Sequence, residues 1–102
     1  MITEIAVLTI DPAKADAFEA AVAQAAPAFR SAAGCHGLAL EHVIEDPSRY
    51  RLVVQWDSVE HHIVMFRNSP AFQTWRGLAG PFFTAPPVVE HSQVVGTYFC
   101  PG

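Results

Sequence analysis

Three side chains able to move a proton or hold an anion stand in otherwise apolar surroundings. His42 falls on the apolar face of a predicted strand, His62 on the apolar face of a predicted helix, and Arg76 follows Trp75 on a further helix. A histidine with its ordinary pKa of about 6.5 exchanges a proton near neutral pH, and a guanidinium stabilises an oxyanion. A buried histidine is more often a hydrogen-bonded core residue, and an arginine beside an aromatic ring more often stacks at the surface, so both interpretations stay open.

Other kinds of chemistry have weaker support in the residue spacing. His61 and His62 are neighbours that point apart on a helix, and no pair of histidines has helical ligand spacing, so no metal site is predicted. A nucleophile formed by Cys35 and His36 lacks evident supporting groups. No glycine-rich phosphate loop, dinucleotide fingerprint or serine nucleophile elbow is present, which argues against nucleotide-binding and hydrolase functions.

The elements that must position these residues follow from the apolar periodicity. The alternation over residues 50–57 predicts a strand, Asp11 and Pro12 open a helix that Pro27 should kink, and Ser69 caps another helix. The predicted strands cover residues 1–10, 37–45, 50–57 and 88–99, and the predicted helices cover 12–33, 59–67 and 70–79. This β-α-β-β-α-β order predicts a ferredoxin-like α+β fold with a four-stranded antiparallel sheet and helices on one face.

The strand patterns divide the apolar residues between two faces of the sheet. The helix-facing side should carry His42 and Ile44 on one strand and should pack against His62 and Ile63. The aromatic walls of a cavity are expected there from Trp56, Phe66, Phe72, Trp75, Phe82 and Phe83. The opposite side is also apolar, which predicts a second copy of the chain and therefore a homodimer; its residues are Ile5, Val7, Ala39, Val43 and Val53.

Composition sets the broad class of protein. The chain has 102 residues, of which 51% are hydrophobic and 16% charged, so a single domain over residues 1–102 with a packed core is expected and disorder is excluded. A net charge of −4 argues against a nucleic-acid surface. No apolar run is long enough to span a membrane and no signal peptide is recognised, so with only two cysteines a cytoplasmic location is expected.

The second half of the chain resembles the antibiotic biosynthesis monooxygenase superfamily. The resemblance depends on the hairpin sequence E-D-P-S-R-Y at residues 45–50, the W-D-S at 56–58, and the S-P-A-F at 69–72. The first strand, the first helix and the turn at Gly34 and Cys35 also lie where the family has them, so the likeness covers nearly the whole chain. It implies a ferredoxin-like dimer whose sheets pack into a dimeric α/β barrel.

The resemblance also assigns provisional roles to individual residues. Trp56 matches a pocket tryptophan of the anthrone oxygenases, and Arg76 matches an arginine on their last helix. His62 stands where those enzymes have a tyrosine, and Leu52 stands where they have an asparagine. Against the haem-degrading branch the fit is worse, because Arg76 falls near the position of the haem-ligating histidine.

Together these observations predict a cofactor-independent monooxygenase that oxidises a small aromatic or quinol-type molecule with dioxygen. His62 or His42 would be the base and Arg76 the cation for the substrate anion. The expected substrate-binding residues are Leu52, Trp56, Phe66, Phe72, Trp75 and Phe83. The alternatives are a binding or detoxification protein without turnover, a haem-binding or haem-degrading enzyme, and an isomerase of a small metabolite.

Overall fold

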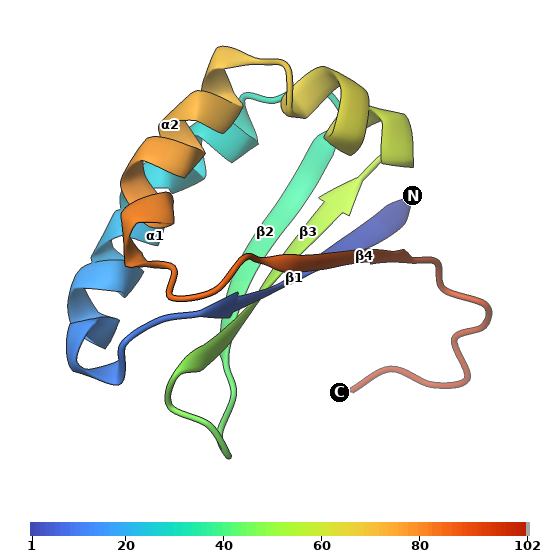
Figure 1. Cartoon of the computed structure of the whole chain (residues 1–102). Coiled ribbons are helices and arrows are strands. Elements are labelled where there is room, and N and C mark those ends of the chain that lie inside the picture. Colours follow the sequence, from blue (N-terminus) through green and yellow to red (C-terminus); the bar gives the residue numbers. More distant parts are fainter. Residues whose placement is uncertain (102) are drawn as a thin grey trace.

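The computed structural model describes residues 1–101 and has a single four-stranded sheet with helices on one face (Figure 1). The strands are β1 (Ile2–Thr9), β2 (Cys35–His42), β3 (Arg49–Trp56) and β4 (Val88–Ser92). The long helices are α1 (Ala15–Arg30) and α2 (Pro70–Ala79), and the short helical segments are η1 (Pro12–Lys14), η2 (His61–Phe66) and η3 (Gly80–Phe82). The strand order is β2-β3-β1-β4 and every neighbouring pair is antiparallel, which confirms the predicted ferredoxin-like fold.

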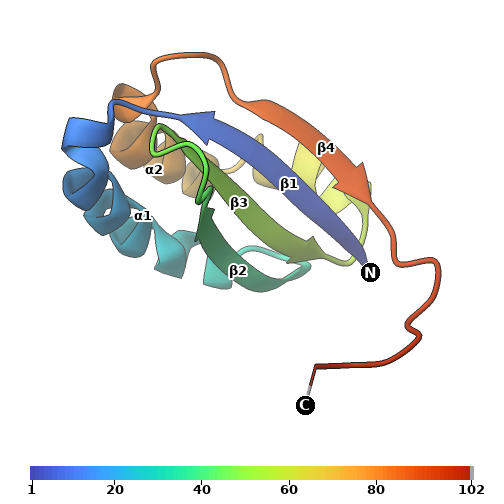
Figure 2. The same cartoon turned by 90° about the horizontal axis from the view of Figure 1, so that it is seen from below.

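Figures 1 and 2 show the two long helices over one face of the sheet. The core lies between these helices and the sheet. Its largest fully buried side chains include Tyr50 and Trp56 from β3 and Phe18 and Phe29 from α1. Phe18 and Phe29 belong to the stripe that the helical periodicity of α1 predicts. On the sheet, Ala6 lies opposite Leu52, so the helix-facing positions of the central strands are in register.

Local signals place most of the element boundaries. The Asp11 side chain accepts a hydrogen bond from the Ala13 amide at the start of η1, and the Ser69 hydroxyl accepts one from the Phe72 amide at the start of α2. The helix α1 continues through Pro27 and ends at Arg30, three residues before the predicted end. Gly34, at φ 77°, then reverses the chain into β2, a conformation that disfavours other residues.

Three sequence-based expectations about the elements are wrong. The second strand ends at His42, so Ile44 lies in the following turn and is 93% exposed instead of facing the helices. Ile63 is exposed, because the residues of η2 that face the core are His62 and Phe66. The last strand ends at Ser92 and not at residue 99, because β1 begins at Ile2 and offers it no partner beyond that point.

The chain beyond β4 runs away from the sheet as an irregular tail (Figures 1 and 2). It carries four exposed apolar side chains, Val94, Val95, Tyr98 and Phe99. The sheet face opposite the helices is apolar at its centre, where Ile5 pairs with Val53, which in turn pairs with Ala39. Polar and charged side chains, among them Gln55, Arg51 and Glu41, flank this centre. A second copy on this face remains a prediction.

The helices of residues 1–101 include none with the length and apolar character needed to cross a membrane. The cytoplasmic location stays a prediction.

Candidate functional site

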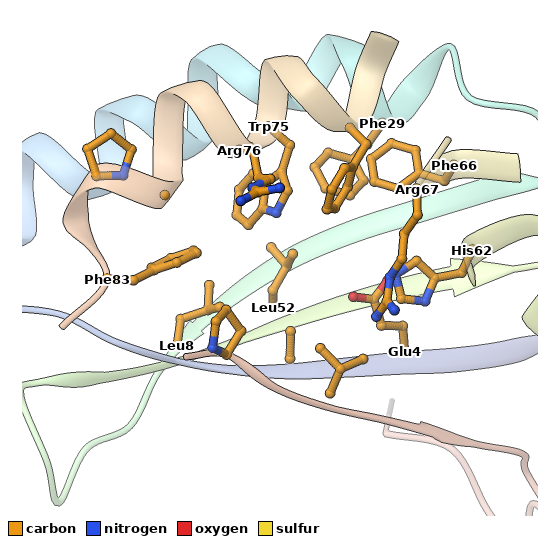
Figure 3. A pocket seen from close by; sticks show the side chains of 16 residues that line it. Glu4, Leu8, Phe29, Leu52, His62, Phe66, Arg67, Trp75, Arg76 and Phe83 are labelled. Atoms are coloured by element: carbon orange, nitrogen blue, oxygen red, sulfur yellow. The ribbon is translucent and has the colours of Figure 1, made fainter. Parts of the chain in front are cut away.

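A cavity of about 580 Å³ opens between the sheet and the helices, in the size range of small-molecule sites (Figure 3). The sheet forms its floor, and α1, η2, α2 and the segment after α2 form its walls. Most of the lining is apolar or aromatic, contributed by Ala6, Leu8, Phe29, Leu52, Phe66, Phe72, Trp75, Phe83 and Val89. Such a surface suits a flat, mainly apolar ligand.

One end of this cavity holds a buried polar cluster. The Trp56 indole Nε1 donates a hydrogen bond to Glu4 Oε1 at 2.9 Å, and His62 Nε2 lies 3.3 Å from the same oxygen. On its other side, His62 Nδ1 is hydrogen-bonded to His91 Nε2 at 2.8 Å. Glu4 and His62 are only 4% and 3% exposed, whereas His91 is partly exposed. A continuous row of polar groups therefore leads from the cavity floor toward the surface.

Strand register brings this cluster together. Glu4 of β1 lies directly opposite His91 of β4, and Ile2 of β1 lies opposite Trp56 of β3. Side chains two residues apart share a sheet face, so Glu4, His91 and Trp56 all point toward the helices. The short segment η2 then packs His62 against them, with the His62 and Trp56 rings stacked at a centroid distance of 5.5 Å.

Burial changes the proton affinity of both ionisable groups at the floor. It raises the pKa of the Glu4 carboxyl above the usual 4.5, although the Trp56 hydrogen bond and the positive charge of Arg67 act in the opposite direction. Burial, with the charge of Arg67 and the presence of His91, lowers the pKa of His62 to about 4. His62 is therefore neutral near pH 7, and the facing carboxylate favours the tautomer with its hydrogen on Nε2.

The second carboxylate oxygen of Glu4 has no hydrogen-bond partner among residues 1–101. Its Oε1 receives the Trp56 hydrogen bond, whereas no group of residues 1–101 donates a hydrogen bond to Oε2. Every fully buried side-chain nitrogen and oxygen of these residues does have a partner. It follows that Oε2 is not fully enclosed, and the residue that carries it lines the cavity.

Two arginines line the same cavity at different places. Figure 3 shows Arg67 reaching toward Glu4 and His62, whereas Arg76 lies beside Trp75 and apart from that pair. The charge of Arg67 affects the pKa of both Glu4 and His62. The ion pairs formed within residues 1–101 include neither arginine. The cavity thus holds two positive side chains and one carboxylate.

The structure brings together some of the predicted site residues and separates others. His62 and Arg76 both line the cavity, as do Leu52, Phe66, Phe72, Trp75 and Phe83. Trp56 does not line it; this residue is fully buried beneath the floor and acts on the cavity through Glu4. Phe82 is also absent from the lining and packs edge-on against Phe18, at a centroid distance of 5.8 Å.

His42 lies outside the cavity, contrary to the prediction that it could act there as a base. It does face the helix side, but on the outer strand β2 and at the end remote from Glu4. Its ring stacks on Tyr50 at 4.1 Å, and its Nε2 is hydrogen-bonded to the Pro47 carbonyl at 2.9 Å. Through these contacts His42 holds the β2–β3 hairpin against Tyr50.

Sequence reasoning missed Glu4, Arg67 and His91. The available signal was the strand pattern of β1, where Glu4 occupies the same face as Ala6 and Leu8 and is the charged member of an apolar row. Burying a carboxylate costs free energy, so a buried carboxylate in an apolar row indicates a functional or paired group. The partnership with His91 depends on register across the sheet and leaves no trace in local spacing.

Cys35 and His36 do not form a nucleophile pair. The Cys35 thiol donates to the Gly37 carbonyl, and burial raises the pKa of this thiol, so the unreactive protonated form is favoured. The His36 ring instead contacts Asp57 at 2.7 Å on the surface. In residues 1–101, no group of three or more histidine, cysteine, aspartate or glutamate side chains is placed to hold a metal ion.

Comparison with known proteins gives consistent matches over most of the chain. Residues 1–78 match the family model for antibiotic biosynthesis monooxygenases. The uncharacterized protein YczJ of Bacillus subtilis is 37% identical over 95 residues, which are 93% of this chain and 100% of that protein.

Solved structures of the same family have a similar fold. A Bordetella bronchiseptica protein, provisionally assigned as an antibiotic biosynthesis monooxygenase, is 52% identical with a TM-score of 0.90, covering 92% of this chain and 96% of its own. SnoaB of Streptomyces nogalater, described as a cofactor-independent oxygenase and solved as a mutant, is 17% identical with a TM-score of 0.75 and 95% of each chain covered. At that identity the likeness to SnoaB concerns the fold alone.

Proposed function

Since this chain belongs to the antibiotic biosynthesis monooxygenase family, we propose that it is a cofactor-independent monooxygenase that oxidises a small hydroxyaromatic, anthrone or quinol-type substrate with dioxygen. The observation that carries the proposal is the buried pair of Glu4 and His62 at the floor of an aromatic-walled cavity. A carboxylate and a histidine removed from water are a costly arrangement, and their place in the lining of the cavity suits proton transfer from a ligand.

The first step is removal of a proton from the substrate. Glu4 Oε2 accepts the proton, and the raised pKa makes this carboxylate a stronger base than an exposed one. His62, whose pKa is lowered to about 4, is a weak base and instead holds Glu4 in place through Nε2. Arg67, close enough to influence the pKa of both groups, stabilises the substrate anion that forms.

The second step is oxidation of this anion by dioxygen. For an anthrone-type substrate, the electron-rich anion transfers electrons to O₂ and a new carbon–oxygen bond forms at the reacting carbon. Loss of water then leaves a quinone, so one oxygen atom enters the product and the other leaves as water. The substrate supplies all four electrons and both hydrogens of that water, so the reaction needs no external reductant.

The cavity walls support both steps. Trp75, Phe66 and Phe83 offer aromatic faces for a flat substrate, and exclusion of water strengthens the interaction between the anion and Arg67. The homodimer belongs to this proposal as well. The apolar centre of the sheet face around Ile5 and Val53 favours a second copy as the covering partner. The tail that follows β4 adds further exposed apolar side chains that a second copy could cover.

The test is oxygen uptake with a panel of anthrones and hydroquinones, using protein checked for bound metal and flavin. We expect uptake by the wild-type protein, a loss of about 100-fold or more in Glu4→Gln, and losses of about tenfold or more in His62→Leu and Arg67→Ala, which remove the group that holds Glu4 and the cation for the anion. Arg30→Gln is the matched control, because Arg30 is an exposed arginine of α1 outside this cavity.

Two outcomes would overturn the proposal. Unchanged rates in Glu4→Gln would remove the proton-transfer role of Glu4, and unchanged rates in His62→Leu would remove the positioning role of His62. Tight binding of the same compounds without any oxygen uptake would favour the alternative function, a small-molecule binding or detoxification protein.

A further inference from the structure

The two arginines of the cavity have different surroundings, and this difference bears on the substrate. Arg67 lies near the carboxylate of Glu4 and interacts with its charge. Arg76 lies on α2 beside Trp75, away from Glu4 in the view of Figure 3, and does not affect the pKa of Glu4 or His62. Arg67 is therefore the arginine whose positive charge acts on the carboxylate at the floor.

Arg76 has no acidic partner among residues 1–101, although acidic residues outnumber basic ones in this chain. Two other arginines of the same structure, Arg49 and Arg51, do form ion pairs, with Asp46 and Glu41. Arg76 is an exposed residue of α2 that lines the cavity, and no acidic group of residues 1–101 occupies its guanidinium donors.

We propose that the cavity selects hydroxyaromatic acids, in which a carboxylate pairs with Arg76 while the hydroxyl group lies at Glu4 Oε2. This inference rests on the proposed function, because it names the substrate class of the same site. A planar guanidinium binds a carboxylate through two parallel hydrogen bonds, which fixes orientation as well as adding affinity.

Electrostatics fixes the direction in which such a molecule lies. The ionised Glu4 repels a carboxylate, so the acidic group of the ligand occupies the end of the cavity near Arg76. The hydroxyl group is then directed toward Glu4 and Arg67, where it loses its proton. The aromatic ring between the two ends lies over Leu52 and against Trp75.

The proposal is tested by calorimetric binding of para-hydroxycinnamate and of its methyl ester, which has the same ring and hydroxyl group but no negative charge. We expect wild-type protein to bind the acid about tenfold or more tightly than the ester, the order of a charge-assisted hydrogen bond. Arg76→Gln should reduce this ratio to near one and leave the affinity for the ester within about twofold. Arg76→Lys should keep part of the preference, because it retains the charge without the planar fork.

Arg30→Gln again provides the matched control and should retain the full preference for the acid. Circular dichroism of each variant establishes that it is folded. An ester that binds wild-type protein as tightly as the acid overturns this inference and leaves the proposed oxidation standing. A preference that survives in Arg76→Gln overturns it as well, and failure of both compounds to bind at millimolar concentration counts against the inference and the hydroxyaromatic site together.

Discussion

Acid should destabilise this protein through His62, which is buried and neutral in the folded chain. Its pKa is lowered from 6.5 to about 4 in the folded chain, chiefly by burial. Between these two pH values the unfolded chain binds a proton at His62 and the folded chain does not, so the free energy of unfolding falls as the pH falls. Above pH 6.5 both states are neutral at this residue, and its contribution no longer changes.

The size of the effect follows from the shift. About 2.5 pH units between the two values, at about 1.36 kcal/mol for each unit, give about 3 kcal/mol lost from pH 7 to pH 4. Glu4 acts in the opposite sense: its raised pKa means that the folded chain holds a proton longer, so stability is lost as the pH rises above 4.5. A measurement on wild-type protein alone would therefore mix the two residues.

The assay compares denaturant unfolding of the wild-type protein and His62→Gln at intervals from pH 4 to pH 8. The glutamine has no proton to gain, and its amide can still donate to Glu4. We expect the stability of the wild-type protein relative to the variant to fall by about 3 kcal/mol from pH 7 to pH 4 and to stay constant above pH 7.

A second comparison removes the influence of Glu4 by making both measurements in a Glu4→Gln background. The same downward trend should remain there, because desolvation of His62 is its main cause. Parallel pH curves for the wild-type protein and His62→Gln in both backgrounds would refute the reasoning, since they would mean that His62 titrates alike in the folded and unfolded chains.

Three further substitutions have expected outcomes. Gly34→Ala should lower the free energy of unfolding by at least about 1–2 kcal/mol, because φ is 77° there and a Cβ would meet the His61 ring; denaturant unfolding measures it. Ser69→Ala removes the cap of α2 and should cost about 1 kcal/mol by the same assay, and no loss would show that the cap is dispensable. Val53→Asp places a charge on the apolar sheet face and should convert a dimer into a monomer in analytical ultracentrifugation. A wild-type protein that sediments as a monomer would contradict the dimer itself.

Much of the fold is determined by local sequence patterns. The alternation along β3 requires an extended strand with Leu52 and Trp56 on one face, and this is what the structure has. Ser69 and Pro70 start α2 because a hydroxyl cap and a proline without an amide hydrogen both suit the first turn of a helix. These signals act within a few residues, so they need no knowledge of the rest of the chain.

The ends of strands are harder to predict from the sequence, because a strand ends where its hydrogen-bonding partner ends. Residues 93–99 have the apolar character of a strand, but β4 stops at Ser92, where its partner β1 is near its own beginning at Ile2. Ile44 was expected to face the helices, yet β2 ends at His42 and the hairpin turns away first. In both places the side-chain pattern continues past the point where hydrogen-bonding partners end.

The sequence by itself determined that the chain forms a ferredoxin-like domain, because periodicity assigns each residue to a face, and it placed His62 on an apolar helix face and Arg76 beside Trp75. Only the tertiary structure decided what surrounds them. Residues 4, 62 and 91 meet because β1 lies between β3 and β4 in one particular register and η2 packs above it. That meeting places Glu4 beside His62 at the cavity floor, while His42 lies outside and Arg76 lies apart from the charge at the floor. Contacts between residues so distant along the chain arise from sheet order and register, which no local pattern encodes.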